Sequence, residues 1–283
     1  MERINFLKNR VINTRPEVDL ENARLLTASY RETAGEPLCV QKAKAFYRQC
    51  AEKTARIWDR ELIVGCSGSQ MRGGIVCADT CWSILDEELD TISSRLYDPF
   101  FLRPEDRETF LSEIKPFWQG RSSLEAWFKQ IPEDTKVLRD NGMVYINRKA
   151  VRGWGETTAG YTQVINEGLR GIIADIENRR FRLDITVAGD YEKDVYLSSM
   201  LIAAEGMILL AKRYADEAER LAGIEADETR KAELLEIAAV CRHVPEFPAR
   251  NFREALQSLY LYQICIFMEQ NAASYNPGRM DQY

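Results

Sequence analysis

The sequence predicts a mainly α-helical protein with few short strands. Its longest regular pattern runs from about Asp190 to Ala222, where apolar residues recur at steps of three and four. Two further helical patterns follow, Glu228–Arg242 and Phe252–Met268. One short apolar segment, Glu61–Gly65, has the pattern of a buried strand. No repeat or low-complexity linker interrupts the chain, so we expect one unit over residues 1–283 with no internal boundary.

The first 180 residues are expected to contain six helices. Asp19 is a good N-cap for the first helix, which should stop at Gly35. Pro104 and the two acids after it open another, because proline suits the first turn and carboxylates suit the positive end of the helix dipole. The other expected helices, separated by Pro and Gly, cover Val40–Ala55 and lie near residues 80–94, 104–114, 122–130 and 161–180.

The apolar stripe of the 190–222 helix has two interpretations. It could form a coiled-coil dimer, or it could pack on neighbouring helices inside one chain. The second is favoured because Glu228–Arg242 and Phe252–Met268 supply such neighbours. The stripe consists of Leu197, Leu201, Ala204, Ile208, Ala211, Ala215, Ala218 and Leu221.

Composition and charge limit the classes of partner. Hydrophobic residues make up 45% of the chain, enough for a substantial core, and the net charge of -6 gives no basic field for nucleic acid or anionic lipid. Residues 1–8 lack the apolar core of a signal peptide, and the longest apolar run, Leu259–Met268, is too short to span a bilayer. We expect a cytoplasmic protein that binds neither nucleic acid nor membrane.

Cysteine and histidine usage disfavours a metal site. The seven cysteines contain no close C-x-x-C pair, and His243 is the one histidine in the sequence. Zinc sites and imidazole-based nucleophile triads therefore have too few ligands or bases. Free, buried thiols in a reducing cytosol are the expected state.

Two polar segments are candidates for a binding site. Between residues 145 and 161 the glycines follow G-x-G-x-x-x-x-G, which matches neither the dinucleotide fingerprint nor a Walker loop. A flexible loop that caps the helix near Tyr161 is the simple interpretation. The second segment, residues 269–283, follows an apolar helix, and loops at the ends of buried elements commonly carry binding groups.

Residues 269–283 also carry a recognisable pattern, E-x-N-x-x-S-x-x-x-G-R-M-D-Q-Y. It resembles a segment of glycyl radical enzymes, the pyruvate formate-lyase and diol-dehydratase superfamily. Three further stretches are similar to blocks of that family, and they occur in the same order. These stretches are Glu61–Gly65, Trp82–Thr91 with Arg95 and Asp98–Phe100, and Pro116–Ser122.

The resemblance implies the N-terminal part of a ten-stranded α/β barrel, supplying outer helices and one wall of the substrate pocket. The family's two radical motifs, R-V-x-G-[YF] and G-C-x-E, do not occur in these 283 residues. Thr186–Asp190 and Gly65–Gly68 imitate them only partly and suit ordinary turns. We therefore expect no catalytic residue and no bound metal or cofactor in this chain, which should be inactive alone. The intact family enzyme carries a glycyl radical installed by a radical-SAM activating enzyme, and is expected to be a homodimer.

The resemblance also implies substrate-binding residues. Gly155–Tyr161 matches a G-H-x-x-x-x-Y frame of dehydratases, with Glu156 in the histidine position and Arg148 in the preceding stretch. A carboxylate suits hydroxyl or ammonium groups. Because Glu156 departs from the histidine of the glycerol and propanediol pattern, the resemblance does not point to those two substrates. Ser274 matches the family serine that contacts substrate, and the neighbouring Tyr275 is expected to shape the pocket wall.

The implied function is a lyase or dehydratase, similar to formate C-acetyltransferases, that cleaves C-O, C-N or C-C bonds of a small polar substrate by thiyl radical chemistry. A non-catalytic helical interaction module is an alternative. A small thiol enzyme is another, and it would need a cysteine of low pKa. Because the chain ends within the family pattern, we expect the Phe252–Met268 helix to expose Leu256, Leu259, Tyr260, Ile264 and Phe267 and the chain to be marginally stable or self-associating.

Overall fold

The computed structural model describes residues 1–144, 157–269 and 275–282, and it is mainly helical with very short strands. The strands are β1 (Glu17–Asp19), β2 (Gly73–Ile75), β3 (Thr157–Thr158) and β4 (Tyr275–Asn276); β1 pairs in parallel with β2, and β3 with β4. The helices are α1 (Glu2–Asn13), α2 (Glu21–Glu32), α3 (Leu38–Glu52), α4 (Ala78–Glu88), α5 (Pro104–Thr109), the π-helical turn η1 (Phe110–Ile114), α6 (Lys115–Trp118), α7 (Ser123–Phe128), α8 (Glu133–Asp140), α10 (Tyr161–Phe181), α11 (Asp190–Ile224), α12 (Glu228–His243) and α13 (Phe252–Glu269).

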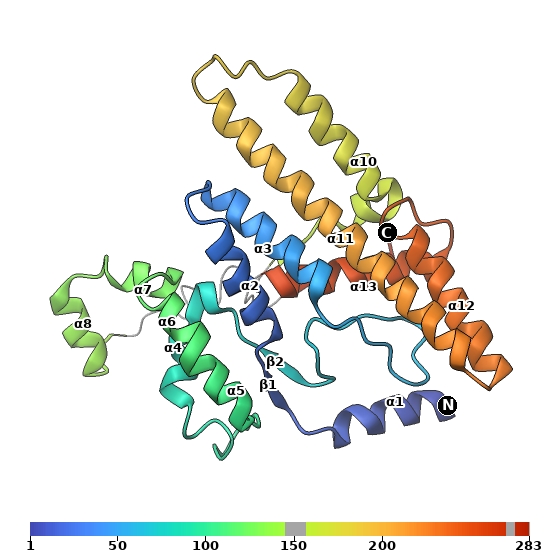
Figure 1. The fold of residues 1–283 in the computed structure, drawn as a ribbon, viewed down its shortest axis with the longest axis horizontal. Coiled ribbons are helices and arrows are strands. Elements are labelled where there is room, and N and C mark those ends of the chain that lie inside the picture. Colours follow the sequence, from blue (N-terminus) through green and yellow to red (C-terminus); the bar gives the residue numbers. More distant parts are fainter. Residues whose placement is uncertain (145–156, 270–274, 283) are drawn as a thin grey trace.

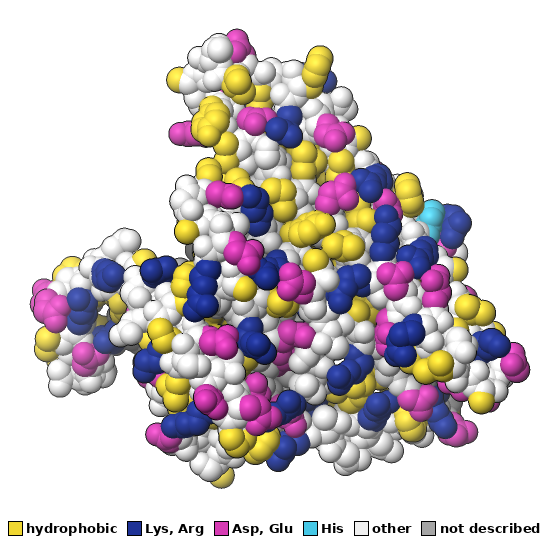
Figure 2. Space-filling view, in the orientation of Figure 1, with side chains coloured by type: hydrophobic (Ala, Val, Ile, Leu, Met, Phe, Trp, Pro, Cys, Tyr) yellow, Lys and Arg dark blue, Asp and Glu magenta, His cyan; other side chains and the backbone are white. Residues whose placement is uncertain are grey.

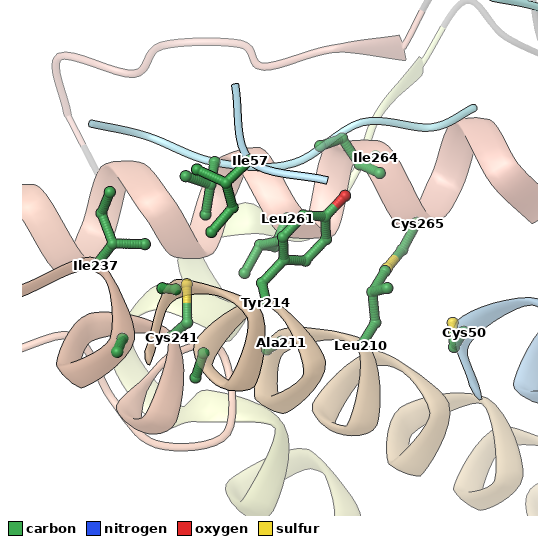
Figure 3. Packing of buried hydrophobic residues seen from close by; sticks show 14 of the residues in the cluster. Cys50, Ile57, Leu210, Ala211, Tyr214, Ile237, Cys241, Leu261, Ile264 and Cys265 are labelled. Carbon is green, nitrogen blue, oxygen red and sulfur yellow. The ribbon is translucent and has the colours of Figure 1, made fainter. Parts of the chain in front are cut away.

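Helix α11 lies at the centre of the larger hydrophobic core, where it packs on α3, α12 and α13 (Figure 1). Small residues on α11, Ala211, Ala215 and Ala218, allow the neighbouring helices to approach closely. Between them Tyr214 is fully buried and points toward Leu261 of α13 (Figure 3). The apolar stripe therefore packs within the chain, which confirms the core interpretation over the coiled coil.

Length and composition alone would also allow α11 to cross a membrane. An 18-residue window of this helix has a mean hydropathy of 1.5, a signal that the shorter Leu259–Met268 run does not give. Core helices of soluble proteins pass the same test. Only 33% of that window is buried in the structure. The buried alanines toward the C-terminal end of α11 pack on other helices of the same chain.

A second core joins α2, α4, η1 and α6, and it contains aromatic residues of the family-like blocks. The indole nitrogen of Trp118 donates to the Thr27 hydroxyl at 2.8 Å, and that of Trp82 donates to the Glu125 carboxylate at 2.9 Å. Glu125 and Ser122 form a capping box at the start of α7. These residues hold helices together, so their role is structural.

The expected strand at 61–65 is wrong. Val64 is fully buried, its N-H donates to Gln257 Oε1 at 2.9 Å, and its carbonyl accepts from Gln257 Nε2 at 2.8 Å. A side chain of α13 thus satisfies the backbone groups that a neighbouring strand would otherwise pair. At Gly65 the backbone has φ +143°, and a Cβ atom would collide with Ile264, so close packing of α13 requires glycine here.

The predicted N-cap of the first helix, Asp19, is also wrong. Leu20, not Asp19, is the N-cap of α2. Asp19 still accepts from the Glu21 N-H at 3.1 Å, and its other oxygen accepts from the Ser69 hydroxyl at 3.0 Å. The carboxylate therefore ties the start of α2 to a distant loop. Helices α1 and α8 and the pairing of β1 with β2 were not predicted.

The expected exposure of α13 is largely wrong. Leu259 and Ile264 are buried, and Leu256 and Phe267 are half-buried. Of the five, Tyr260 alone is exposed, at 39%. The helix buries this face against other helices and the extended segment around Val64. Phe252 and Tyr260 are the exposed large apolar residues of α13, so this helix offers little apolar surface for association. Self-association of the chain stays a prediction.

Helices α10 and α11 form a hairpin that projects from the rest of the molecule (Figure 1). Apolar side chains gather along this hairpin on the face shown in Figure 2, where acidic and basic side chains are interspersed below it. Phe181, Ile185 and Tyr191 near its tip are exposed. The visible face therefore carries no broad field of one charge sign.

Candidate functional site at the pairing of β3 with β4

The two polar segments singled out in the sequence meet where β3 pairs with β4. Thr157 lies opposite Tyr275, and Thr158 lies opposite Asn276, in a parallel register. Of the expected substrate-binding residues, Tyr275 is described, whereas Arg148, Glu156 and Ser274 lie outside the described residues. The pairing places the ends of the two segments side by side even though they are far apart in the sequence.

Gln263 of α13 forms hydrogen bonds on both sides of this strand pair's junction with the helices, to β4 and to the start of α10. Its amide nitrogen donates to the Tyr275 carbonyl at 3.2 Å, and its amide oxygen accepts a hydrogen bond from the hydroxyl of Tyr161. Tyr161 is the first residue of α10 and is 1% exposed. The rings of Tyr262 and Tyr161 pack edge to face with their centroids 5.6 Å apart, and those of Phe267 and Tyr275 do the same at 6.2 Å. Helix α13 therefore holds β4 and the start of α10, the helix that follows β3.

We expect Gln263→Leu to weaken this anchor, because leucine keeps the volume but can neither donate nor accept. The free energy of unfolding should fall by about 1–3 kcal/mol, since the buried Tyr161 hydroxyl loses an acceptor. Urea unfolding measures the loss, and amide hydrogen exchange should accelerate at Tyr275. Gln163→Leu, on the exposed face of α10, is the matched control. Equal stability of the two variants would contradict the anchoring role.

An apolar cavity of about 440 Å³ lies on the inner side of the strand pair. Ala159, which follows β3, and Tyr275 of β4 form one wall. Phe46 of α3 and Met200 of α11 also line this cavity. The side chain of Tyr275 therefore faces the helices.

A half-buried lysine, Lys42, lines this cavity. The Lys42 Nζ atom lies 2.6 Å from the Asp79 carboxylate and 3.5 Å from that of Glu269, the first residue of the terminal pattern. Burial lowers the pKa of Lys42, but the two carboxylates outweigh burial and hold that pKa above its ordinary value. Burial, with the Asp79 charge, raises the pKa of Tyr30 to about 12. Lys42 thus stays charged and fixes the end of α13 next to the terminal segment.

Sequence analysis missed Gln263 and Lys42 as residues that position the site. Gln263 left a visible signal, because it interrupts the apolar run Leu259–Met268. Polar groups inside apolar helices usually have a hydrogen-bond partner, so such an interruption marks a contact. Lys42 left no comparable signal, since its partners Asp79 and Glu269 come from distant helices.

The two stretches that imitate radical motifs behave as ordinary turns. Gly189 has φ +87° and is the N-cap of α11, a left-handed conformation that favours glycine. Within the other imitation, the Cys66 N-H donates to the Tyr214 hydroxyl at 2.9 Å. Neither geometry points to radical chemistry.

The thiols do not support an independent thiol enzyme. A reactive cysteine needs a lowered pKa, whereas burial raises the pKa of Cys50 and Cys66 and brings those of Cys77 and Cys241 to about 12. Across the described ranges, the cysteines are buried or half-buried and form no disulfide. In the same ranges no group of three or more His, Cys, Asp or Glu side chains could hold a metal ion.

Comparison with known proteins places the whole chain in one family. The model of pyruvate formate lyase-like proteins matches residues 1–283. Isethionate sulfite-lyase of Nitratidesulfovibrio vulgaris is 34% identical to it, over 100% of this chain and 35% of the relative. Trans-4-hydroxy-L-proline dehydratase of Clostridioides difficile is 31% identical, over 100% of this chain and 36% of the relative.

Solved structures agree with the sequence comparison. The glycerol-bound B12-independent glycerol dehydratase from Clostridium butyricum has a TM-score of 0.96 and 31% identity, covering 100% of this chain and 36% of that one. A glycyl radical enzyme from Archaeoglobus fulgidus has a TM-score of 0.91 and 29% identity, covering 97% of this chain and 35% of that one. The chain thus spans about a third of the length of the relatives it matches, and the expected mainly helical part of the glycyl radical barrel fold is confirmed. The chain belongs to the pyruvate formate lyase-like family, which includes the glycyl radical enzymes.

Proposed function

We propose that these residues are the N-terminal portion of a glycyl radical lyase or dehydratase that cleaves a carbon-heteroatom bond or a C-C bond of a small polar substrate. The observation that carries the proposal is the parallel pairing of β3 with β4. It joins the segment that follows Glu156 to the segment that follows Ser274, the two positions that match substrate-binding residues of the family. An active-site wall needs this kind of convergence of distant segments.

Each proposed site residue has a distinct role. Glu156, covalently bonded to Thr157, accepts hydrogen bonds from substrate hydroxyl groups or attracts an ammonium group. Ser274, bonded to Tyr275, donates to or accepts from the same substrate, and Arg148 offers a cation to an anionic group. Tyr275 supports the wall from the helix side, because its ring packs on Phe267 and lines the inner cavity.

The remaining chemistry belongs to the complete enzyme. A radical-SAM activating enzyme installs the radical on a glycine, and a cysteine thiyl radical then takes a hydrogen atom from the substrate. Elimination of water or cleavage of a carbon-heteroatom bond follows, and the thiol returns the hydrogen atom to the product radical. We propose a cytoplasmic homodimer that binds neither nucleic acid nor membrane. No observation on the described residues favours the helical interaction module.

A substrate panel tests this function on the complete enzyme, activated under anaerobic conditions. Isethionate, trans-4-hydroxy-L-proline, glycerol and propane-1,2-diol are suitable, because similar proteins act on compounds of this kind. We expect radical-dependent turnover of at least one member, with glycerol and propane-1,2-diol turned over less well because Glu156 replaces the family histidine. A glycyl radical without turnover of any member would contradict the proposed substrate class.

A further inference from the structure

The strand pair formed by β3 and β4 has two faces, one toward the inner cavity and one on the opposite side. Side chains alternate along an extended strand, and residues opposite each other in a parallel pair share a face. Ala159 and Tyr275 face the inner cavity. Thr158 and Asn276, which are paired with each other, therefore occupy the opposite face. This outer face carries a hydroxyl group beside an amide group.

Both groups are available to a ligand. Thr158 and Asn276 are exposed, and neither side chain has a hydrogen-bond partner among the residues that the structure describes. Neighbouring strands lie about 4.8 Å apart, so one small molecule can contact both side chains. A threonine hydroxyl and an asparagine amide each donate and accept, and neither carries a charge.

The backbone beneath these side chains is fixed in place. Gln263 donates to the Tyr275 carbonyl, and Phe267 packs on the Tyr275 ring, so the position just before Asn276 is held on two sides. Binding groups on a supported backbone lose less freedom when a ligand binds than groups on a free loop do. The outer face of the strand pair therefore has the rigidity of a binding surface.

We infer that Thr158 and Asn276 determine specificity by hydrogen bonding an uncharged hydroxyl group of the substrate. The inference rests on the proposed function, which places the substrate at this strand pair. Because the pair is neutral, it orients a hydroxyl group and contributes little attraction to a charged end. Substrates that carry a hydroxyl group beside the bond to be broken fit this surface.

The test uses the complete, activated enzyme and the member of the panel that it turns over fastest. Asn276→Ala and Thr158→Val should each lower kcat/KM about 2- to 12-fold, the effect of losing one neutral hydrogen bond. Asn276→Ser keeps a donor and an acceptor and should restore part of the loss. Asn9→Ala, on the exposed surface of α1, is the matched control and should keep the wild-type value.

Radical content, measured by EPR in every sample, separates the two claims. Wild-type radical content in Asn276→Ala and Thr158→Val together with unchanged kcat/KM would overturn the inference and leave the proposed function standing. An Asn276→Ser variant no better than Asn276→Ala would also overturn it, because the loss would then reflect backbone disturbance. A wild-type enzyme that forms no radical would overturn the proposed function and the inference with it.

Discussion

The 283-residue chain alone, incubated anaerobically with an activating enzyme of the family, S-adenosylmethionine and a reductant, will show no glycyl radical signal by EPR. The physical reason is that neither radical motif occurs in these residues. Gly189, the closest imitation, caps α11 in a left-handed turn and lacks the neighbouring arginine and aromatic residues of the family motif.

The complete enzyme, treated in the same way, is the positive control and should give a doublet. Gly189→Ala in the 283-residue chain distinguishes the sources of any signal that does arise. A doublet from this chain that disappears in Gly189→Ala would show that the turn before α11 stores the radical. That result would contradict the assignment of the radical to another part of the enzyme.

Glu156→Gln in the complete enzyme is expected to lower kcat/KM by about 12- to 150-fold. The substitution keeps the size of the side chain and removes its charge, so a hydrogen bond to a charged group worth about 1.5–3 kcal/mol is weakened. The radical content should stay at the wild-type level, because Glu156 is proposed to contact substrate and not the radical. Steady-state kinetics and EPR on the same preparation give both values.

Glu192→Gln, an exposed carboxylate near the start of α11, is the matched control for charge removal. Its kinetic constants should equal those of the wild type. Unchanged constants in Glu156→Gln as well would return Glu156 to the status of an ordinary loop residue. Ser274 and Arg148 would then have to account for substrate binding.

The long helices were predictable because their pattern is local. In α11 the small and apolar residues recur every three or four positions, so the buried face can be read without knowledge of its partners. The expected end at Ala222 and the observed end at Ile224 differ by two residues, which is ordinary fraying. Helices α1 and α8 were not predicted although their apolar residues gather on one side, and none of their residues is buried.

The short strands were not predictable because their pairing is not local. Two-residue strands such as β3 and β4 have no alternation long enough to recognise, and their partners lie in distant parts of the chain. At residues 61–65, in contrast, a strand was predicted and none forms. The segment around Val64 is apolar like a strand, but the side chain of Gln257 supplies its backbone hydrogen bonds. Buried backbone needs partners, and the sequence alone does not show whether a strand or a side chain provides them.

The candidate site also has a part that the sequence predicts and a part that it does not. The resemblance to the family identified the candidate substrate-binding residues from two motifs, residues 155–161 and 269–283. The pairing of Thr157 with Tyr275 explains how these two segments lie side by side. Gln263 and Lys42, which hold that place, depend on helix packing and were found only in three dimensions.

A crystal structure of the complete enzyme with the panel substrate bound tests the central claim most directly. We expect the substrate to lie against the outer face of the β3 and β4 pair, with its hydroxyl group within hydrogen-bond distance, about 2.7–3.2 Å, of Asn276 or Thr158. A substrate bound in the inner cavity beside Met200, or remote from both strands, would contradict the claim.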